Sequence, residues 1–253
     1  MSTPRSRSSR RSSTPSRSDA DILARRYAAD GTPLGSEFVV NKTLAGSQVA
    51  PAVAVDANGN FVVAWRGPIA AGSTIRDAYV RRYNANGAPL GDDLRVLPQG
   101  FGSWNQGSIH VDIASDAKGN FVLVSEESTE LGRASTLRFQ RFDNYGNRKE
   151  NGYLDEGIEV PGGHNPAISM TANGRFAITW EGYTTREREY YSDSHIRAQR
   201  FDAAGKALGA SVRVNSYDYE AQVWPKISHD AYGDYAITWT TQHRIVGGFF
   251  FTL

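Results

Sequence analysis

The sequence contains no cysteine. Without thiols the chain forms no disulfide, performs no thiolate chemistry and offers no cysteine-based metal site. Long apolar runs are missing too, because no window approaches the roughly 18 apolar residues that a membrane-spanning helix needs. No segment shows sustained helical periodicity, and the N-terminal residues lack the apolar region of a signal peptide. The secondary structure is therefore expected to consist of strands.

The net charge of +1 hides an uneven distribution. Residues 1–18 hold five arginines and no acid, so the remaining residues carry a net charge of −4. This mildly acidic body gives no argument for nucleic-acid binding. The Arg/Ser-rich stretch over 1–20 is predicted to be a disordered tail, with an arginine-rich arm for nucleic acid or a targeting peptide as the alternatives. Residues 21–253 are predicted to form a single domain.

Two motifs alternate along that domain. One is an Arg-aromatic strand that ends in a glycine turn, and its arginine recurs at intervals of 56, 59 and 59 residues, as Arg26, Arg82, Arg141 and Arg200. The other is a hairpin of the type PAVAVDANGNFVVAW, whose turn glycine recurs as Gly59, Gly119, Gly174 and Gly233. A fixed order of two motifs indicates tandem repetition of one unit of roughly 57 residues.

Each copy is expected to supply four strands. Bulky and small residues alternate with period 2 in the hairpins, which is typical of strands whose two faces are both covered. The turn glycines stand where a tight hairpin needs positive φ, and an aspartate precedes three of them to accept backbone N–H groups: Asp56, Asp116 and Asp230. The pattern predicts an all-β, propeller-like fold of four four-stranded repeats.

The two ends of the domain carry different halves of the unit. Residues 22–41 match the third and fourth strands, whereas residues 225–239 match the first and second. Pairing of these two segments would complete the last sheet and close a ring without free edges. The alternative is that the four copies belong to a longer array.

The combination RRYNANGAPLG and PAVAVDANGNFVVAW resembles tandem repeats of large bacterial secreted or surface proteins. Its hairpins are also similar to the Asp-box turns of sialidases, with Ser228, Asp230, Gly233 and Trp239 as the nearest match. The first resemblance implies a propeller-like fold and a secreted or cell-surface location. The second supports the fold and implies no activity, because the Asp-box is structural in those families.

The recurring charged residues have two interpretations. The four arginines could converge on an anion, but a residue present in every copy more often serves the repeat by bonding neighbouring carbonyls or carboxylates. The aspartate turns lack the six to eight oxygens and the distal acid of a calcium loop, so turn chemistry is favoured. The histidines are scattered, acidic pairs such as Glu126/Glu127 are merely adjacent, and no catalytic motif is present. We therefore expect no metal, no cofactor and no enzymatic activity.

Variable connections between the sheets are where binding is expected to lie. They hold exposed aromatic candidates for stacking on sugars or proteins: Trp104, Tyr190, Tyr191, Tyr217, Tyr219 and Trp224. The leading hypothesis is a non-enzymatic binding or adhesion module whose partner is a glycan or a surface protein. The alternatives are a sialidase-like glycoside hydrolase, which requires two carboxylates close together in a pocket, and a purely structural repeat.

Overall fold

The computed structural model describes residues 19–43, 46–96, 108–128, 135–149, 163–183, 194–217 and 220–242. Every regular element in these ranges is a β-strand, so the all-β prediction is confirmed there. No helix in the same ranges is long and apolar enough to cross a membrane. Most of the predicted N-terminal tail lies outside the described residues.

The strands form five antiparallel sheets. Each four-stranded sheet consists of the two strands of the hairpin, the Arg-aromatic strand and a short fourth strand. The sheets are β1 (Leu23–Ala24) with β2 (Phe38–Val39); β3 (Val49–Val55), β4 (Phe61–Pro68), β5 (Arg76–Tyr83) and β6 (Leu94–Arg95); β7 (Ser108–Ser115), β8 (Phe121–Ser128) and β9 (Ser135–Phe142); β10 (His164–Met170), β11 (Phe176–Tyr183), β12 (Ser194–Phe201) and β13 (Val212–Arg213); and β14 (Ala221–His229) with β15 (Tyr235–Gln242).

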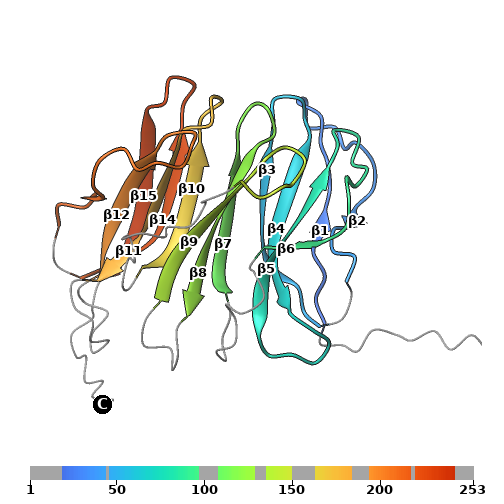
Figure 1. The fold of residues 1–253 in the computed structure, drawn as a ribbon, viewed down its shortest axis with the longest axis horizontal. Helices are drawn as coiled ribbons and strands as arrows, with labels where there is room; N and C mark the ends of the chain where they lie inside the picture. The colour runs from blue at the N-terminus through green and yellow to red at the C-terminus, as the bar shows by residue number, and fades with distance from the viewer. Residues whose placement is uncertain are drawn as a thin grey trace, which may run out of the picture.

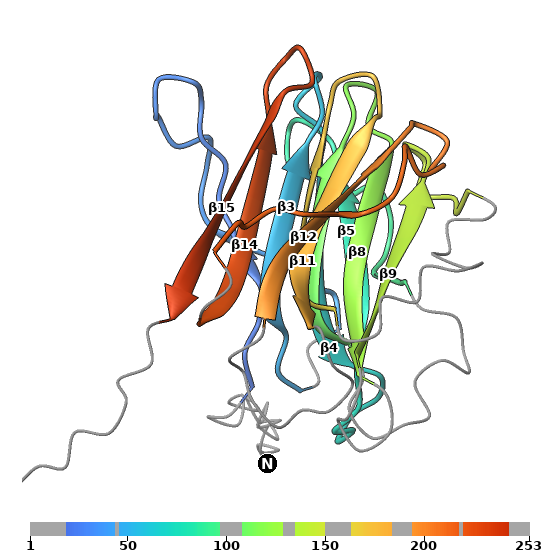
Figure 2. The same ribbon diagram turned by 90° about the vertical axis from the view of Figure 1, so that its left-hand side faces the viewer.

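The sheets stand side by side in chain order, from β1–β2 at one end to β14–β15 at the other (Figure 1). Figure 2 views the same row from the β14–β15 end. The first strand of each complete sheet contacts the first strand of the next, along β3, β7, β10 and β14. Among the described residues β1–β2 and β14–β15 are separate two-stranded sheets. The predicted pairing of 22–41 with 225–239 is therefore not confirmed, because stacking through the first strands leaves these two half-sheets apart.

The core lies between the sheets and follows the predicted alternation of large and small residues. Val62 and Ala64 on the small face of β4 pack against Phe121 and Leu123 on the bulky face of β8. The same pattern recurs one sheet later, where the small face of β8 meets the bulky face of β11: Val122 and Val124 with Phe176, Ile178 and Trp180. This interdigitation fixes how far each sheet can slide past its neighbour.

The hairpin turns form one end of every complete sheet. Gly59, Gly119, Gly174 and Gly233 have φ of 81°, 83°, 86° and 97°, a conformation that favours glycine. The Asp116 carboxylate, for example, accepts N–H groups of Lys118 and Asn120 at 2.9 Å each, which satisfies the turn internally. The fourth strands are short, since β2, β6 and β13 have two residues each.

The opposite end of each hairpin is irregular. The ladder between the first and second strands shifts register near the start of the first strand in all four hairpins. Equivalent non-glycine residues at three of these bulges have positive φ: Ala50 at 54°, Asn165 at 48° and Trp224 at 55°. Strained backbone of this kind is found where the surrounding structure holds it for a purpose. The bulges turn backbone N–H groups toward the neighbouring sheet, and the candidate site lies there.

Candidate active site

One position of the hairpin repeat differs chemically from copy to copy. It directly follows the position of Trp65, Ser125, Trp180 and Trp239 in the second strand, and it holds Arg66, Glu126, Glu181 and Thr240. Both glutamates are buried, with exposures of 1% for Glu126 and 2% for Glu181. Because buried carboxylates are costly unless they are hydrogen-bonded, their partners decide what they can do. We call Glu126, Glu181, His110, His164 and Asn165 the glutamate cluster.

Glu126 on β8 is surrounded by hydrogen-bond donors from two sheets. His110 on its own sheet lies with Nδ1 2.9 Å from Oε2. From the next sheet, His164 places Nδ1 2.6 Å from Oε1, and the Asn165 N–H at the bulge donates to Oε2 at 3.0 Å. The His110 side chain is 48% exposed, so it connects the buried carboxylate to the surface.

Glu181 on β11 occupies the same position one sheet further along. Its Oε1 accepts the bulge N–H of Trp224 at 2.6 Å and the Asn165 side-chain amide, also at 2.6 Å. Asn165 therefore contacts both glutamates, Glu126 through its backbone and Glu181 through its side chain. The positive φ of Asn165 is shared with the equivalent Ala50 and Trp224, so the bulge itself is a feature of the repeat and the two contacts are specific to Asn165.

The two carboxyl groups have pKa values shifted in opposite directions. Burial opposes ionisation of Glu126, but the hydrogen bonds from His110 and His164 outweigh it and lower the pKa to about 2. Burial raises the pKa of Glu181, and the negative charge of Glu126 adds to the rise against the bonds from Trp224 and Asn165. One neighbouring carboxyl is thus held ionised while the other is biased toward its protonated form. Such a divergence is the electrostatic basis of acid/base pairs.

Arg66 extends the row on the other side of Glu126. Burial and the positive charge of Arg76 lower the pKa of its half-buried guanidinium. The negative charge of Glu126 partly offsets this shift. The Nε atom of Arg66 is buried without a hydrogen-bond partner in the structure. In the described residues no group of three histidine, aspartate or glutamate side chains has the geometry of a metal site.

Sequence inspection missed this cluster. His110 and His164 looked scattered, yet both bond the same carboxylate, and His164 is 38 positions from Glu126 along the chain. The signal was present in the alignment of the four copies, because charged residues occupy a position where a purely structural repeat would keep one residue type. These residues can be recognised as one cluster only when the stacking of the adjacent sheets is known.

The aromatic candidates divide into described and undescribed residues. Trp104, Tyr190, Tyr191 and Tyr219 lie outside the described residues. Tyr217 and Trp224 are 55% and 58% exposed. Trp224 is joined to the cluster, since its backbone N–H bonds Glu181 while its indole remains exposed to solvent.

Two of the recurring arginines, Arg82 and Arg141, bond backbone carbonyls at the turn end. Arg82 donates to Asn144 O of the next sheet at 2.6 Å and to Leu90 O of its own at 3.1 Å. Arg141 donates in the same way to Ala203 O and Ala204 O. These guanidinium groups link consecutive sheets, and in the described structure they do not converge on one point.

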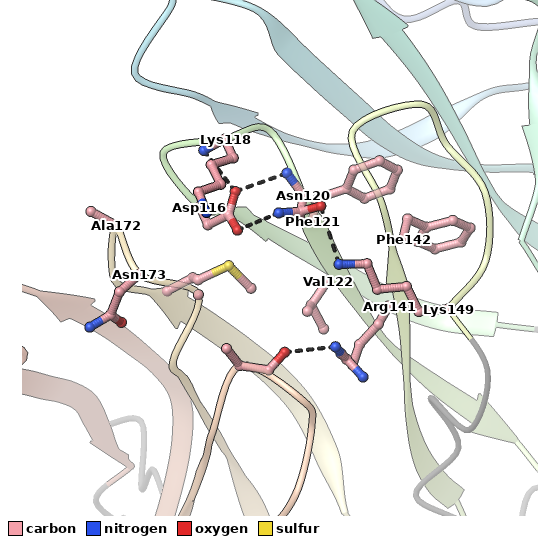
Figure 3. Close-up of a pocket in the computed structure, with 13 residues that line it drawn as sticks. Asp116, Lys118, Asn120, Phe121, Val122, Arg141, Phe142, Lys149, Ala172 and Asn173 are labelled. Atoms are coloured by element: carbon pink, nitrogen blue, oxygen red, sulfur yellow. Dashed lines mark hydrogen bonds between the residues drawn. The ribbon is translucent and has the colours of Figure 1, made fainter.

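A cavity of about 500 Å³ also lies at the turn end, between the sheets of β7–β9 and β10–β13 (Figure 3). Its polar groups are engaged with one another. The Asp116 carboxylate bonds Asn120 in its own turn, Lys149 donates to the Asn120 side chain at 3.2 Å, and Arg141 reaches the carbonyl oxygens of the facing turn. The residues that line this cavity belong mostly to the repeat, so the glutamate cluster is the better candidate for chemistry.

No protein-family model and no curated protein sequence matches the chain. Solved structures do match its fold. An α-L-arabinanase of Penicillium chrysogenum, solved with arabinobiose, gives a TM-score of 0.62 at 14% identity, covering 90% of this chain and 70% of that one. A GH93 α-L-arabinofuranosidase of Fusarium graminearum with arabinobiose gives 0.58 at 10% identity, covering 89% and 68%. An endo-arabinase of Bacteroides thetaiotaomicron gives 0.50 at 15% identity, covering 84% and 81%.

These similarities correct two predictions. The expected non-enzymatic adhesion module and the expected absence of activity are overturned, because the matching structures are glycoside hydrolases. Local sequence motifs gave no sign of an enzyme, and the glutamate cluster is assembled from residues of two sheets that are far apart in the sequence. No comparison supports the Asp-box resemblance or a large surface protein. What the comparisons establish is that the chain shares the β-propeller fold of these hydrolases.

Proposed function

We propose that the chain is a glycoside hydrolase that cleaves arabinose-containing oligosaccharides or polysaccharides at the glutamate cluster. The observation that carries the proposal is the pair of buried carboxyl groups, Glu126 and Glu181, bridged by Asn165 and shifted in pKa in opposite directions. Glycosidic bonds are cleaved by such pairs, in which one carboxyl donates a proton and the other acts as base or nucleophile.

The environments of the two glutamates suggest their roles. Glu181, whose pKa is raised by burial, is the proton donor to the leaving oxygen. Glu126, ionised above a pKa of about 2, is the base, and the partly exposed His110 links it to the surface of the site. Asn165 fixes the spacing of the pair because it bonds both carboxylates.

Sugar binding is assigned to Trp224. Trp224 is exposed to solvent, and its backbone N–H bonds Glu181. A sugar ring stacked on the indole would therefore lie near Glu181, the proposed proton donor. The substrate class comes from the matching structures, two of which contain arabinobiose. A sugar face stacked on an aromatic ring is the recognition expected for a neutral pentose chain.

The proposal is tested by incubating the protein with linear arabinan and with arabinobiose and measuring the release of reducing sugar. The wild-type protein should produce shorter arabinose products. Glu126→Gln and Glu181→Gln should each lower kcat by about 100-fold or more, since general acid–base groups contribute about 10²–10⁴ in rate. Trp224→Ala should mainly raise KM.

Glu37→Gln is the matched control, because Glu37 is an exposed glutamate outside the cluster. It should leave kcat and KM unchanged. If the wild-type protein hydrolyses neither substrate, or if both glutamine variants keep full activity with an intact fold by circular dichroism, the proposed function is wrong.

A further inference from the structure

The first strands of neighbouring sheets lie against one another although they belong to different ladders. β7 contacts β10 and β10 contacts β14, while each pairs with the second strand of its own sheet. Apolar packing between such strands is non-directional, whereas a hydrogen bond tolerates only a narrow range of distances and angles. The bonds from the bulges to Glu126 and Glu181 therefore need the first strands to be held in a fixed position along one another.

A side chain of β7 bonds the backbone of β10. One carboxylate oxygen of Asp112 accepts the N–H of Ile168 at 3.0 Å, and the other accepts the N–H of Ile113 on its own strand at 2.9 Å. Ile168 is three residues beyond Asn165, whose N–H bonds Glu126 across the same two sheets. At about 3.3 Å per residue, the two contacts are separated by about 10 Å or less along β10.

The joint between β10 and β14 contains the same kind of bond. The Ser169 hydroxyl on β10 accepts the N–H of His229 on β14 at 3.0 Å. On the same strand of that next sheet, the Trp224 N–H bonds Glu181. Each glutamate joint thus combines one bond from a bulge with one bond between the first strands.

Both acceptors depart from the repeat. The other copies hold different residues at the position of Asp112, namely Ala52, Ala167 and Lys226. At the position of Ser169 they hold Ala54, Ala114 and Ser228. On β3 both positions are alanine, whose side chain accepts no hydrogen bond, yet β3 still contacts β7. The sheets therefore stack without such acceptors, and the acceptors occur in the joints where a glutamate bonds the next sheet.

We propose that Asp112 and Ser169 are positioning residues for the reaction at the glutamate cluster, an inference that rests on the proposed function. Asp112 holds β10 so that its bulge reaches Glu126. Ser169 holds β14 so that its bulge reaches Glu181. Each residue acts on the glutamate of its own joint, which distinguishes this role from a general contribution to stability.

Backbone amide hydrogen exchange tests the two joints without any substrate. Alanine is what other copies carry at both positions, so Asp112→Ala and Ser169→Ala should fold. Asp112→Ala should speed exchange of the Asn165 amide about tenfold and leave the Trp224 amide unchanged. Ser169→Ala should produce the reverse pattern, and Ser169→Thr, which keeps the hydroxyl, should exchange like the wild-type protein.

Two matched controls separate position from residue type. Ser228→Ala changes the exposed serine at the equivalent position of β14. Asp116→Ala changes an aspartate that bonds its own turn. Both should leave the two bulge amides unchanged. Equal acceleration of both amides in Asp112→Ala or Ser169→Ala would overturn the proposal, and so would exchange at the wild-type rate.

Kinetics on the arabinose substrates measures the consequence for the reaction. Each alanine variant should lower kcat about tenfold or more with little change in KM, since a displacement of about 1 Å can cost about 100-fold in rate. The variants should also move different limbs of the pH profile, because each bulge N–H lowers the pKa of the glutamate that it bonds. Asp112→Ala should shift the acid limb of Glu126 to higher pH, and Ser169→Ala the alkaline limb of Glu181.

The other ionisable groups around the pair are the same in every variant: Arg66, His110 and His164. The same limb moving in both variants, or an unchanged kcat in both, would contradict the assigned roles. If the wild-type protein hydrolyses no arabinose substrate, the proposed function fails, and the exchange rates still decide whether these two residues position the cluster.

Discussion

The two ends of each hairpin share one backbone pattern but differ in what repeats there. At the turn end the same residues recur in sheet after sheet, and their side chains satisfy the turns or bond backbone carbonyls of the next sheet. At the bulge end the equivalent position holds Arg66, Glu126, Glu181 and Thr240. The recurring polar residues therefore maintain the fold, whereas the proposed chemistry lies where a repeat position changes its residue.

Removal of Glu126 should cause one of the largest losses of stability. Glu126→Ala leaves the Asn165 N–H and His164 without their buried acceptor, and breaking such a buried charged network costs about 3–5 kcal/mol. Chemical denaturation should show this decrease in the free energy of unfolding. A change below about 1 kcal/mol would mean that the bulge end is not held by the cluster.

Two tryptophans at the same repeat position sharpen the comparison between interior and terminal sheets. Trp65 and Trp239 each donate to a glutamine side chain, Gln48 at 3.0 Å and Gln222 at 2.8 Å. Trp65 is 1% exposed and Trp239 is 37% exposed. Trp65→Ala should therefore cost about 3–5 kcal/mol, and Trp239→Ala about half as much or less. Thermal denaturation should rank them in this order.

At the turn end the effect should be smaller and purely structural. Asp116→Ala removes the acceptor of the Lys118 and Asn120 N–H groups, and because the Asp116 side chain is itself buried the cost should be about 1–3 kcal/mol. The hydrolytic rate constant should stay unchanged, because the turn lies at the far end of the hairpin from the cluster. A large fall in kcat with the fold intact would show that the turn end takes part in catalysis, which would contradict the assignment of catalysis to the bulge end.

The charge of Glu126 should also be visible in the pH dependence of stability. The pKa of Glu126 is about 2 in the folded protein, below its ordinary value of 4.5, so its ionised form adds stability above pH 4.5 that is lost as the pH falls through about 2. Glu126→Gln should therefore flatten the acid limb of the stability curve between these pH values. An unchanged slope in the variant would show that the carboxylate is not held ionised by its neighbours.

Much of the fold follows from the sequence because its determinants are local. The positive φ of Gly59 and the aspartate bonds of the turns are set within a few residues, and the alternation of Val62 and Ala64 with bulkier neighbours predicted the packing between sheets. The cluster is different, since His164 and Glu126 meet only after two sheets have stacked in one register. Closure also depends on the cumulative angle between sheets, which no single repeat encodes.

The most direct measurement is the pH profile of kcat/KM on an arabinose oligosaccharide, which reports the ionisations of the free enzyme. The account predicts activity that requires ionised Glu126 and protonated Glu181, with an acid limb near pH 2 and an alkaline limb above the ordinary glutamate value of 4.5. Glu181→Gln should abolish the alkaline limb together with most of the rate. A profile that rises toward alkaline pH, with the same shape in that variant, would contradict the central claim.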